Sequence, residues 1–221
     1  MKDIRAIKGR NYIHGLIEEG EHEHQDFKFA ISDARKIARS ISAFANNDGG
    51  RLLIGVKDNG VVAGIRNEEE AYMIETAAET FCRPAVEVDI KAFRVDDGAV
   101  VLQVSIPRSL RPPVSVVEEG GQLKAYYRVK DENMVAPEEL RRAWEYYAAN
   151  EGMLLQLDER QRRLLEMIES QGEVTLEQFM LDTHSSRHQA VDLFGRLISS
   201  EVVALAHNGT DFVLRLPTTI N

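Results

Sequence analysis

The 221-residue sequence predicts an α+β fold divided between two domains, residues 1–150 and 151–221. Apolar residues alternate at strand spacing around Phe27 and recur at helical spacing between Asp33 and Asn46. Beyond the boundary, the pattern changes to three short amphipathic helices followed by a pair of strands. The hydrophobic content of 43% is ordinary for a protein with a packed core.

The strand of residues 21–28 opens the first domain. Strand alternation places Asp26 and Lys28 on one face and Phe27 on the other, in the core. A helix is predicted from Asp33 to Asn46, with Ser32 or Asp33 able to cap its first turn. Its apolar positions are Ile37, Ile41, Phe44 and Ala45.

Residues 46–50 end this helix, because Asn and Gly tolerate the positive φ with which a chain reverses direction. The apolar run 51–57 has strand length, and Asp58-Asn59-Gly60 predicts a hairpin turn into a strand of residues 61–65. Asp58 therefore lies at a strand end, where side chains are usually accessible. Further along, we expect a helix at 68–81 and strands at 100–106 and 125–129.

Three segments resemble the Schlafen-type AlbA domain, a family also described as divergent AAA-like. They are the entry E-x4-D-F-K, the turn S-A-F-A-N-N-D-G-G and the strand L-L-I-G-V-K-D. The resemblance implies a mixed sheet and a role in nucleic-acid binding or transcription regulation. In nuclease members three carboxylates are catalytic, and Glu21, Asp26 and Asp58 occupy those positions, Asp26 where the family more often has Glu.

Such a trio could hold Mg²⁺ or Mn²⁺ through oxygen ligands, with Lys28 steadying a phosphate. The chain would then be a divalent-metal-dependent endoribonuclease. The alternative is that these acids are solvated strand-end residues, since Asp58 before Asn-Gly also suits a turn. ATP is not expected as a cofactor, because no Walker A loop is present and Gly49-Gly50 follows a helix and precedes a strand.

The second domain resembles a winged helix-turn-helix. Helices are expected at 158–170, 175–181 and 186–199, and strands at 202–207 and 211–216. In such a fold the third helix enters the DNA major groove, so Arg187, His188 and Gln189 would reach base edges and Arg196 a phosphate. A purely structural or dimerising module is the alternative.

A basic surface is also predicted on the first domain, where Arg35, Lys36 and Arg39 share one side of the helix and Arg51 begins the next strand. A solvated helix face would show the same pattern. The net charge of −9 and the pI near 5.2 argue against bulk attraction to nucleic acid, so any binding must use a local basic face.

The favoured function is a homodimeric, cytoplasmic DNA-binding transcriptional regulator. The alternatives are the endoribonuclease and a nucleotide-responsive signalling module. A cytoplasmic location is expected because no apolar run approaches membrane-spanning length, no signal-peptide segment is evident, and Cys82 is the single cysteine. Partners would be DNA or RNA and a second copy of the chain, with no membrane.

Overall fold

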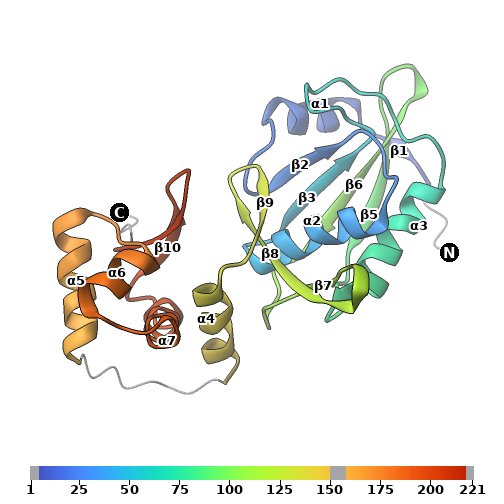
Figure 1. The fold of residues 1–221 in the computed structure, drawn as a ribbon. Helices are drawn as coiled ribbons and strands as arrows, with labels where there is room; N and C mark the ends of the chain where they lie inside the picture. Colours follow the sequence, from blue (N-terminus) through green and yellow to red (C-terminus); the bar gives the residue numbers. More distant parts are fainter. Residues whose placement is uncertain (1–4, 150–157, 218–221) are drawn as a thin grey trace. The chain divides into compact units, whose positions relative to one another are not determined.

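A computed structural model describes residues 5–149 and 158–217 (Figure 1). The chain divides into two compact units, Met1–Val135 and Ala136–Asn221. This division precedes the boundary expected at 150/151, because the helix α4 (Glu138–Ala149) packs against α7 (Arg187–Ser199) in the second unit. Residues 150–157, which contain the expected boundary, lie outside the described residues.

A mixed five-stranded sheet forms the centre of the first unit, as the resemblance implies. Its order is β1 (Ile7–Lys8), β5 (Asp89–Arg94), β6 (Val100–Ile106), β3 (Gly50–Ile54) and β2 (Gln25–Lys28). The pairs β1–β5 and β2–β3 are parallel, and β3–β6 and β5–β6 are antiparallel. A mixed sheet of this kind buries both faces, so alternate residues of β3 enter two different cores.

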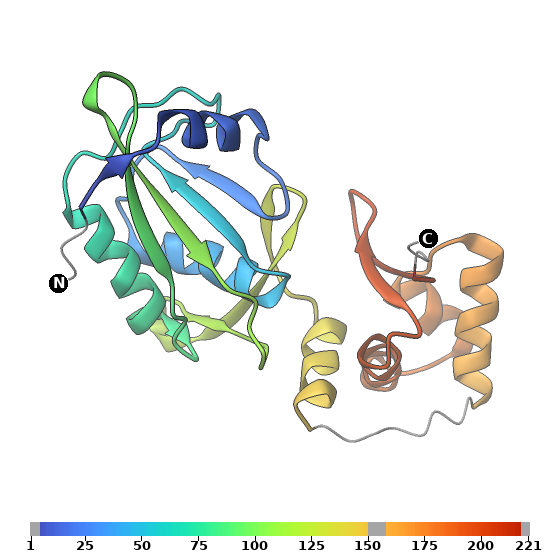
Figure 2. The same cartoon turned by 180° about the vertical axis from the view of Figure 1, so that it is seen from behind.

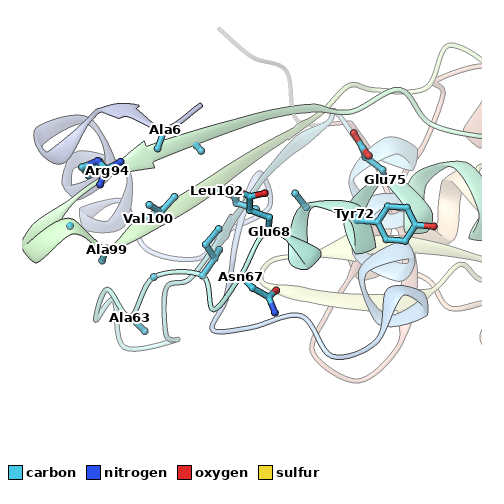
Figure 3. Close-up of a pocket in the computed structure, with 15 residues that line it drawn as sticks. Ala6, Ala63, Asn67, Glu68, Tyr72, Glu75, Arg94, Ala99, Val100 and Leu102 are labelled. Atoms are coloured by element: carbon cyan, nitrogen blue, oxygen red, sulfur yellow. The ribbon is translucent and has the colours of Figure 1, made fainter. Parts of the chain in front are cut away.

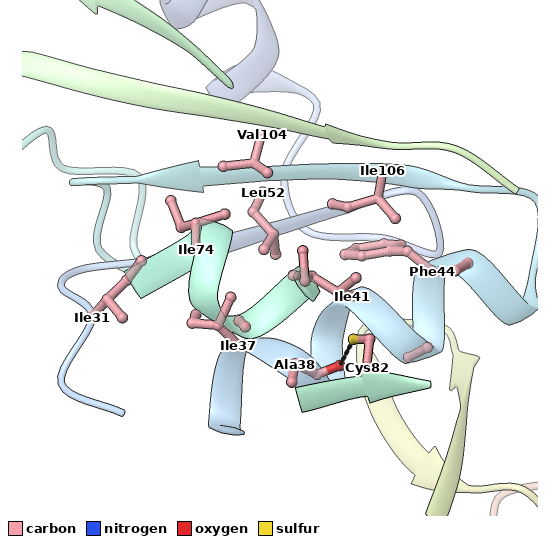
Figure 4. Packing of buried hydrophobic residues seen from close by; sticks show 14 of the residues in the cluster. Ile31, Ile37, Ala38, Ile41, Phe44, Leu52, Ile74, Cys82, Val104 and Ile106 are labelled. Carbon is pink, nitrogen blue, oxygen red and sulfur yellow. Dashed lines mark hydrogen bonds between the residues drawn. The ribbon is translucent and has the colours of Figure 1, made fainter. Parts of the chain in front are cut away.

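Two helices cover the two faces (Figures 1 and 2). The helix α1 (Arg10–Glu18) packs Ile13 on one face beside Phe27 and Leu53. The helix α2 (Ala34–Asn46) packs on the other, where Leu52 lies among its apolar side chains (Figure 4). The predicted alternation of Phe27 into a core is thereby confirmed.

A second, four-stranded sheet lies against the other side of α2. Its order is β4 (Cys82–Arg83), β7 (Ser115–Val117), β8 (Leu123–Val129) and β9 (Glu132–Val135). Cys82 is fully buried and its thiol donates to the Ala38 carbonyl at 3.8 Å (Figure 4). Burial raises the pKa of this thiol to about 12, so Cys82 packs in the core as a neutral thiol.

Some expected elements differ from the structure. The helix expected at 68–81 is α3 (Glu69–Thr76), followed by a π-helical turn Ala77–Phe81. The strand expected at 61–65 does not form; the chain there makes one bridge, between Val56 and Val62. Short 3₁₀ turns occupy Asp96–Gly98 and Glu119–Gly121.

The glycine pair after α2 is fixed by close contacts as well as by backbone geometry. Gly49 has φ of +78°, and a Cβ there would lie 2.7 Å from the Ile106 carbonyl oxygen. A Cβ on Gly50 would lie 2.4 Å from the Phe44 ring. The turn therefore lets α2 and β3 approach each other more closely than any side chain would allow.

The second unit contains the three helices and the hairpin that the sequence predicts. They are α5 (Glu159–Gln171), α6 (Leu176–Thr183), α7, β10 (Ala204–His207) and β11 (Phe212–Arg215). Capping boxes begin the three helices, through Asp158, Thr175 and Ser186. Phe179 and Phe194 pack with ring centroids 5.4 Å apart in the core. No helix within the described residues is long and apolar enough to span a membrane.

Candidate nucleic-acid interface and the carboxylate cluster

Three of the four predicted catalytic residues meet at β2. Glu21 Oε1 accepts a 2.8 Å hydrogen bond from the Phe27 amide, and Asp26 lies near enough to Glu21 to raise its pKa. Asp26 is 3% exposed, with Lys28 Nζ 2.7 Å from its Oδ2 and Arg128 Nη2 3.5 Å from its Oδ1. Two carboxyl groups and two cations therefore form one cluster, in which Asp26 and Arg128 are buried and Glu21 and Lys28 are half-buried.

Asp58 does not join this cluster. It is exposed in the turn after β3, and over residues 5–149 and 158–217 no group of three His, Cys, Asp or Glu side chains is placed to hold a metal ion. Asp26 already has Lys28 and Arg128 as charge partners. The arrangement does not fit the three-carboxylate coordination of Mg²⁺ or Mn²⁺ that the family resemblance implies.

Glu21 is the group whose ionisation the cluster changes. Burial, together with the neighbouring Asp26, raises the pKa of Glu21 from 4.5 to about 7. The folded protein therefore holds this proton more tightly than the unfolded chain does. The contribution of protonated Glu21 to the free energy of unfolding is complete below pH 4.5 and is lost as the pH rises through about 7.

We expect Glu21→Gln to remove this part of the pH dependence. A glutamine amide can accept from the Phe27 amide and donate to Asp26 without a titratable proton. In thermal unfolding, the variant should match the wild type below pH 4.5 and exceed it above pH 7. The exposed Glu23→Gln variant is the control, and a pH-independent gap between Glu21→Gln and the wild type would contradict the prediction.

Two of the basic residues predicted on the first unit are held by acids. Arg39 donates to both Glu118 oxygens, at 2.9 and 2.7 Å, and this interaction lowers the pKa of Glu118. Arg51 donates to Gln25 Oε1 at 2.6 Å and to Glu19. Both guanidinium groups already have protein partners, so binding a phosphate would require breaking those contacts.

The other two differ in exposure. Arg35 stacks 4.9 Å from the centroid of the Phe81 ring and lies 3.6 Å from Glu119. Lys36 is exposed on α2. On the predicted basic face, Arg35, Arg39 and Arg51 therefore have protein partners, and Lys36 is the exposed cation best placed to bind a phosphate.

Three of the four DNA-contact residues predicted in the second unit lie around one hollow. A hollow of about 450 Å³ lies between the start of α5 and the exposed side of α7. Its described lining residues are Asp158, Arg160, Gln161, His188, Gln189, Asp192, Leu193 and Arg196. Three predicted contact residues, His188, Gln189 and Arg196, therefore line one surface depression with Arg160.

Arg160 was missed by the sequence reasoning. It lies in the first turn of α5, within the run Glu159-Arg160-Gln161-Arg162 that follows the cap Asp158. That basic run was the available signal, because a helix whose start is fixed by a capping box fixes the direction of its first side chains. Arg187, by contrast, donates to Glu138 at 3.0 Å and to Glu177 at 3.2 Å.

The sequence match agrees with this division of the chain. A model of the Schlafen AlbA_2 family matches residues 21–137, just over half of the chain. The chain belongs to the Schlafen AlbA_2 family. The AlbA_2 match ends at Pro137, immediately before α4, and it contains Glu21, Asp26 and Asp58. The α5–α7 hollow lies outside it. No curated protein matches the chain.

Two solved structures are similar to this AlbA_2 protein at low identity. The DIP2311 protein from Corynebacterium diphtheriae is 22% identical with a TM-score of 0.41, over 59% of this chain and 25% of that one. The N-terminal domain of a DNA helicase RecG-related protein from Nitrosomonas europaea is 19% identical with a TM-score of 0.41, over 55% of this chain and 88% of that one.

The first unit of the AlbA_2 protein also has a hollow of about 520 Å³, between β5, β6 and α3 (Figure 3). Val100 and Leu102 lie in its floor, and Glu68, Glu75 and Arg94 are among its lining residues. Two carboxylates and one guanidinium line this hollow, a balance of charge that does not favour a phosphate. This hollow therefore lends no support to the nucleotide-responsive alternative.

Proposed function

We propose that the chain is a nucleic-acid-binding protein, a DNA-binding transcriptional regulator whose second unit is a winged helix-turn-helix. The observation that carries the proposal is the α5–α7 hollow, where Arg160 and Arg196 lie with His188 and Gln189. Arginine binds phosphate, and glutamine, histidine and arginine can hydrogen-bond base edges. The acidic chain thus concentrates suitable contact types at one place.

The order of elements supports this proposal. The helices α5, α6 and α7 precede the two-stranded hairpin. The third of them, α7, has an exposed and polar first turn. In winged helix-turn-helix proteins that helix reads the major groove. A homodimer placing two α7 helices at successive half-sites belongs to the same proposal.

The endoribonuclease is the weaker candidate, since Asp58 lies apart from the pair Glu21 and Asp26. If RNA and not DNA is bound, the binding assay below will show it when repeated with an RNA duplex and a single strand of the same sequence.

We expect the double variant Arg160→Ala/Arg196→Ala to lose most of its DNA affinity. Each phosphate contact contributes about 0.9 to the slope of log affinity against log salt, so the slope should fall by about 2. Fluorescence anisotropy of a labelled, mixed-sequence DNA duplex in a salt series measures both quantities.

Arg163→Ala is a matched control, because Arg163 is bonded to Asp182 between α5 and α6 and does not line the hollow. It removes one positive charge without removing a proposed contact. No binding of duplex by the wild type at low salt would overturn the proposal, as would an equal loss in the control and the double variant.

A further inference from the structure

The helix α4 covers the side of α7 that faces away from the three-helix core. Phe194 and Leu197 of α7 are buried in the core with α5 and α6. Gly195 is buried as well, but against α4. In the second unit α7 lies between α4 on one side and α5 and α6 on the other (Figures 1 and 2).

The two helices touch at Gly195. A Cβ built there would lie 2.7 Å from Arg142 Cγ and 3.1 Å from the Ala143 amide nitrogen. Such separations leave no room for even a methyl group. The helix α4 is therefore seated directly on the α7 backbone at this point, and no side chain of α7 separates them.

Polar contacts hold α4 along the length of α7. Near the middle, Arg142 donates to Asp192 Oδ1 from Nε at 3.0 Å and from Nη2 at 2.7 Å, and the Tyr146 hydroxyl donates to the same oxygen. At the N-terminal end, Arg187 donates to Glu138 Oε2 at 3.0 Å. We call these contacts the α4 clasp. The clasp occupies Arg187, one of the residues that the sequence predicts to reach DNA.

We propose that α4 is an intramolecular gate that must leave α7 before α7 can enter the DNA major groove. This inference rests on the proposed function. A helix with its side chains is about 10–12 Å across and the major groove is about 12 Å wide, so the groove admits one helix and not two stacked helices. The α5–α7 hollow stays open beside the clasp, and α4 covers the side of α7 that faces away from α5 and α6.

The connection between α4 and the strand that precedes it is short. Only Ala136 and Pro137 separate Val135, the last residue of β9, from Glu138, the first residue of α4. The clasp helix is thus the direct continuation of a strand of the AlbA_2 unit.

The first test weakens the clasp from the α4 side and leaves the sequence of α7 intact. The variant Glu138→Gln/Arg142→Ala/Tyr146→Phe removes one negative and one positive charge, so the net charge is unchanged. We expect it to bind a labelled, mixed-sequence DNA duplex about fivefold more tightly than the wild type, the lower range of coupling between sites. Arg163→Ala is the control, and it should not tighten binding.

The result distinguishes the gate from a simpler role of α4. If α4 served to neutralise Asp192 on the DNA-facing surface, the triple variant would expose that carboxylate and bind more weakly. Equal or weaker binding therefore overturns the gate, while duplex binding by the wild type keeps the proposed function. No duplex binding by any form at low salt overturns both.

A disulfide gives a second test that does not depend on how far the triple variant opens. The built Gly195 Cβ lies 2.8 Å from Arg142 Cβ, and a small outward shift of α4 would give the Cβ separation of about 3.8 Å found in disulfides. Oxidised Arg142→Cys/Gly195→Cys should bind the duplex at least about fivefold more weakly than the same protein reduced. Equal binding in the two redox states contradicts the gate.

Discussion

Replacing Arg128 with alanine is expected to lower the free energy of unfolding of the first unit by about 3–5 kcal/mol. Arg128 is 2% exposed, although its side chain is charged. Its loss would remove the guanidinium beside Asp26 Oδ1 and leave the half-buried Lys28 to balance that buried carboxylate. Removing one partner of a buried ion pair costs more than the pair itself contributes, because the remaining charge stays out of water.

Arg128 also connects segments that are far apart in the chain. Its Nη1 donates to Asn133 Oδ1 at 2.9 Å, and Nη2 donates to the carbonyl groups of His22 and Gln25 at 3.4 and 3.3 Å. The guanidinium carbon lies 4.9 Å from the centroid of the Phe44 ring. One side chain thus joins β8 and β9 to the segment that enters β2.

Hydrogen exchange measures the loss of stability in Arg128→Ala separately for each unit. Amides of β3 and β6 report on the first unit, and amides of α5 and α7 report on the second. Protection should fall in the strands and persist in the helices. Lys124→Ala, an exposed position on the same strand β8, is the matched control. A loss no larger than in Lys124→Ala would show that Arg128 is dispensable.

The local elements were predictable because their causes are local. Asp33, one of the two expected caps, accepts from the Arg35 amide at the start of α2, and Thr175 forms a capping box with Gln178 at the start of α6. The burial of Arg128 was not predictable, because its partners lie about one hundred residues away in the sequence. Sequence alternation shows that it lies on a strand and cannot show what covers the strand.

The domain boundary shows the same limit. Leu140 and Trp144 are four residues apart on one side of α4, and both are buried. An amphipathic face does not identify the unit against which it packs. The sequence therefore assigned α4 to the first domain, whereas Gly195 and the clasp join it to the second.

The candidate site was predicted in part. His188, Gln189 and Arg196 line one hollow, as their shared helix allows. Arg39 and Arg51 looked equally suitable, but acids brought near by the tertiary fold engage them, and Arg196 is itself 3.0 Å from Asp192 Oδ2, one turn earlier on α7. Basic residues can be counted in a sequence, whereas their availability depends on which carboxylates the fold brings beside them.

Asn46→Ala is expected to lower the free energy of unfolding of the first unit by about 3–5 kcal/mol. The reason is that each buried polar group left unpaired costs about 1–3 kcal/mol. Asn46 Nδ2 donates to the carbonyl groups of Val114 and Tyr126 at 2.9 and 2.8 Å, and its Oδ1 accepts from the Val114 amide at 2.7 Å. The side chain therefore ties α2 to the second sheet. Alanine would remove the acceptor of the buried Val114 amide and the Asn46 donor to the Tyr126 carbonyl, while Ser42 Oγ would still donate to the Val114 carbonyl at 2.7 Å.

The outcome separates two explanations of the Asn46–Gly50 motif. If Asn46 only ends the helix, alanine should be neutral or slightly stabilising, because Asn46 is still helical and alanine is the better helix former. Asn59→Ala, which loses one exposed 3.2 Å bond to the Val61 amide, is the control in urea unfolding followed by hydrogen exchange. A large loss at Asn46 with little change at Asn59 would show that Asn46 ties α2 to the second sheet.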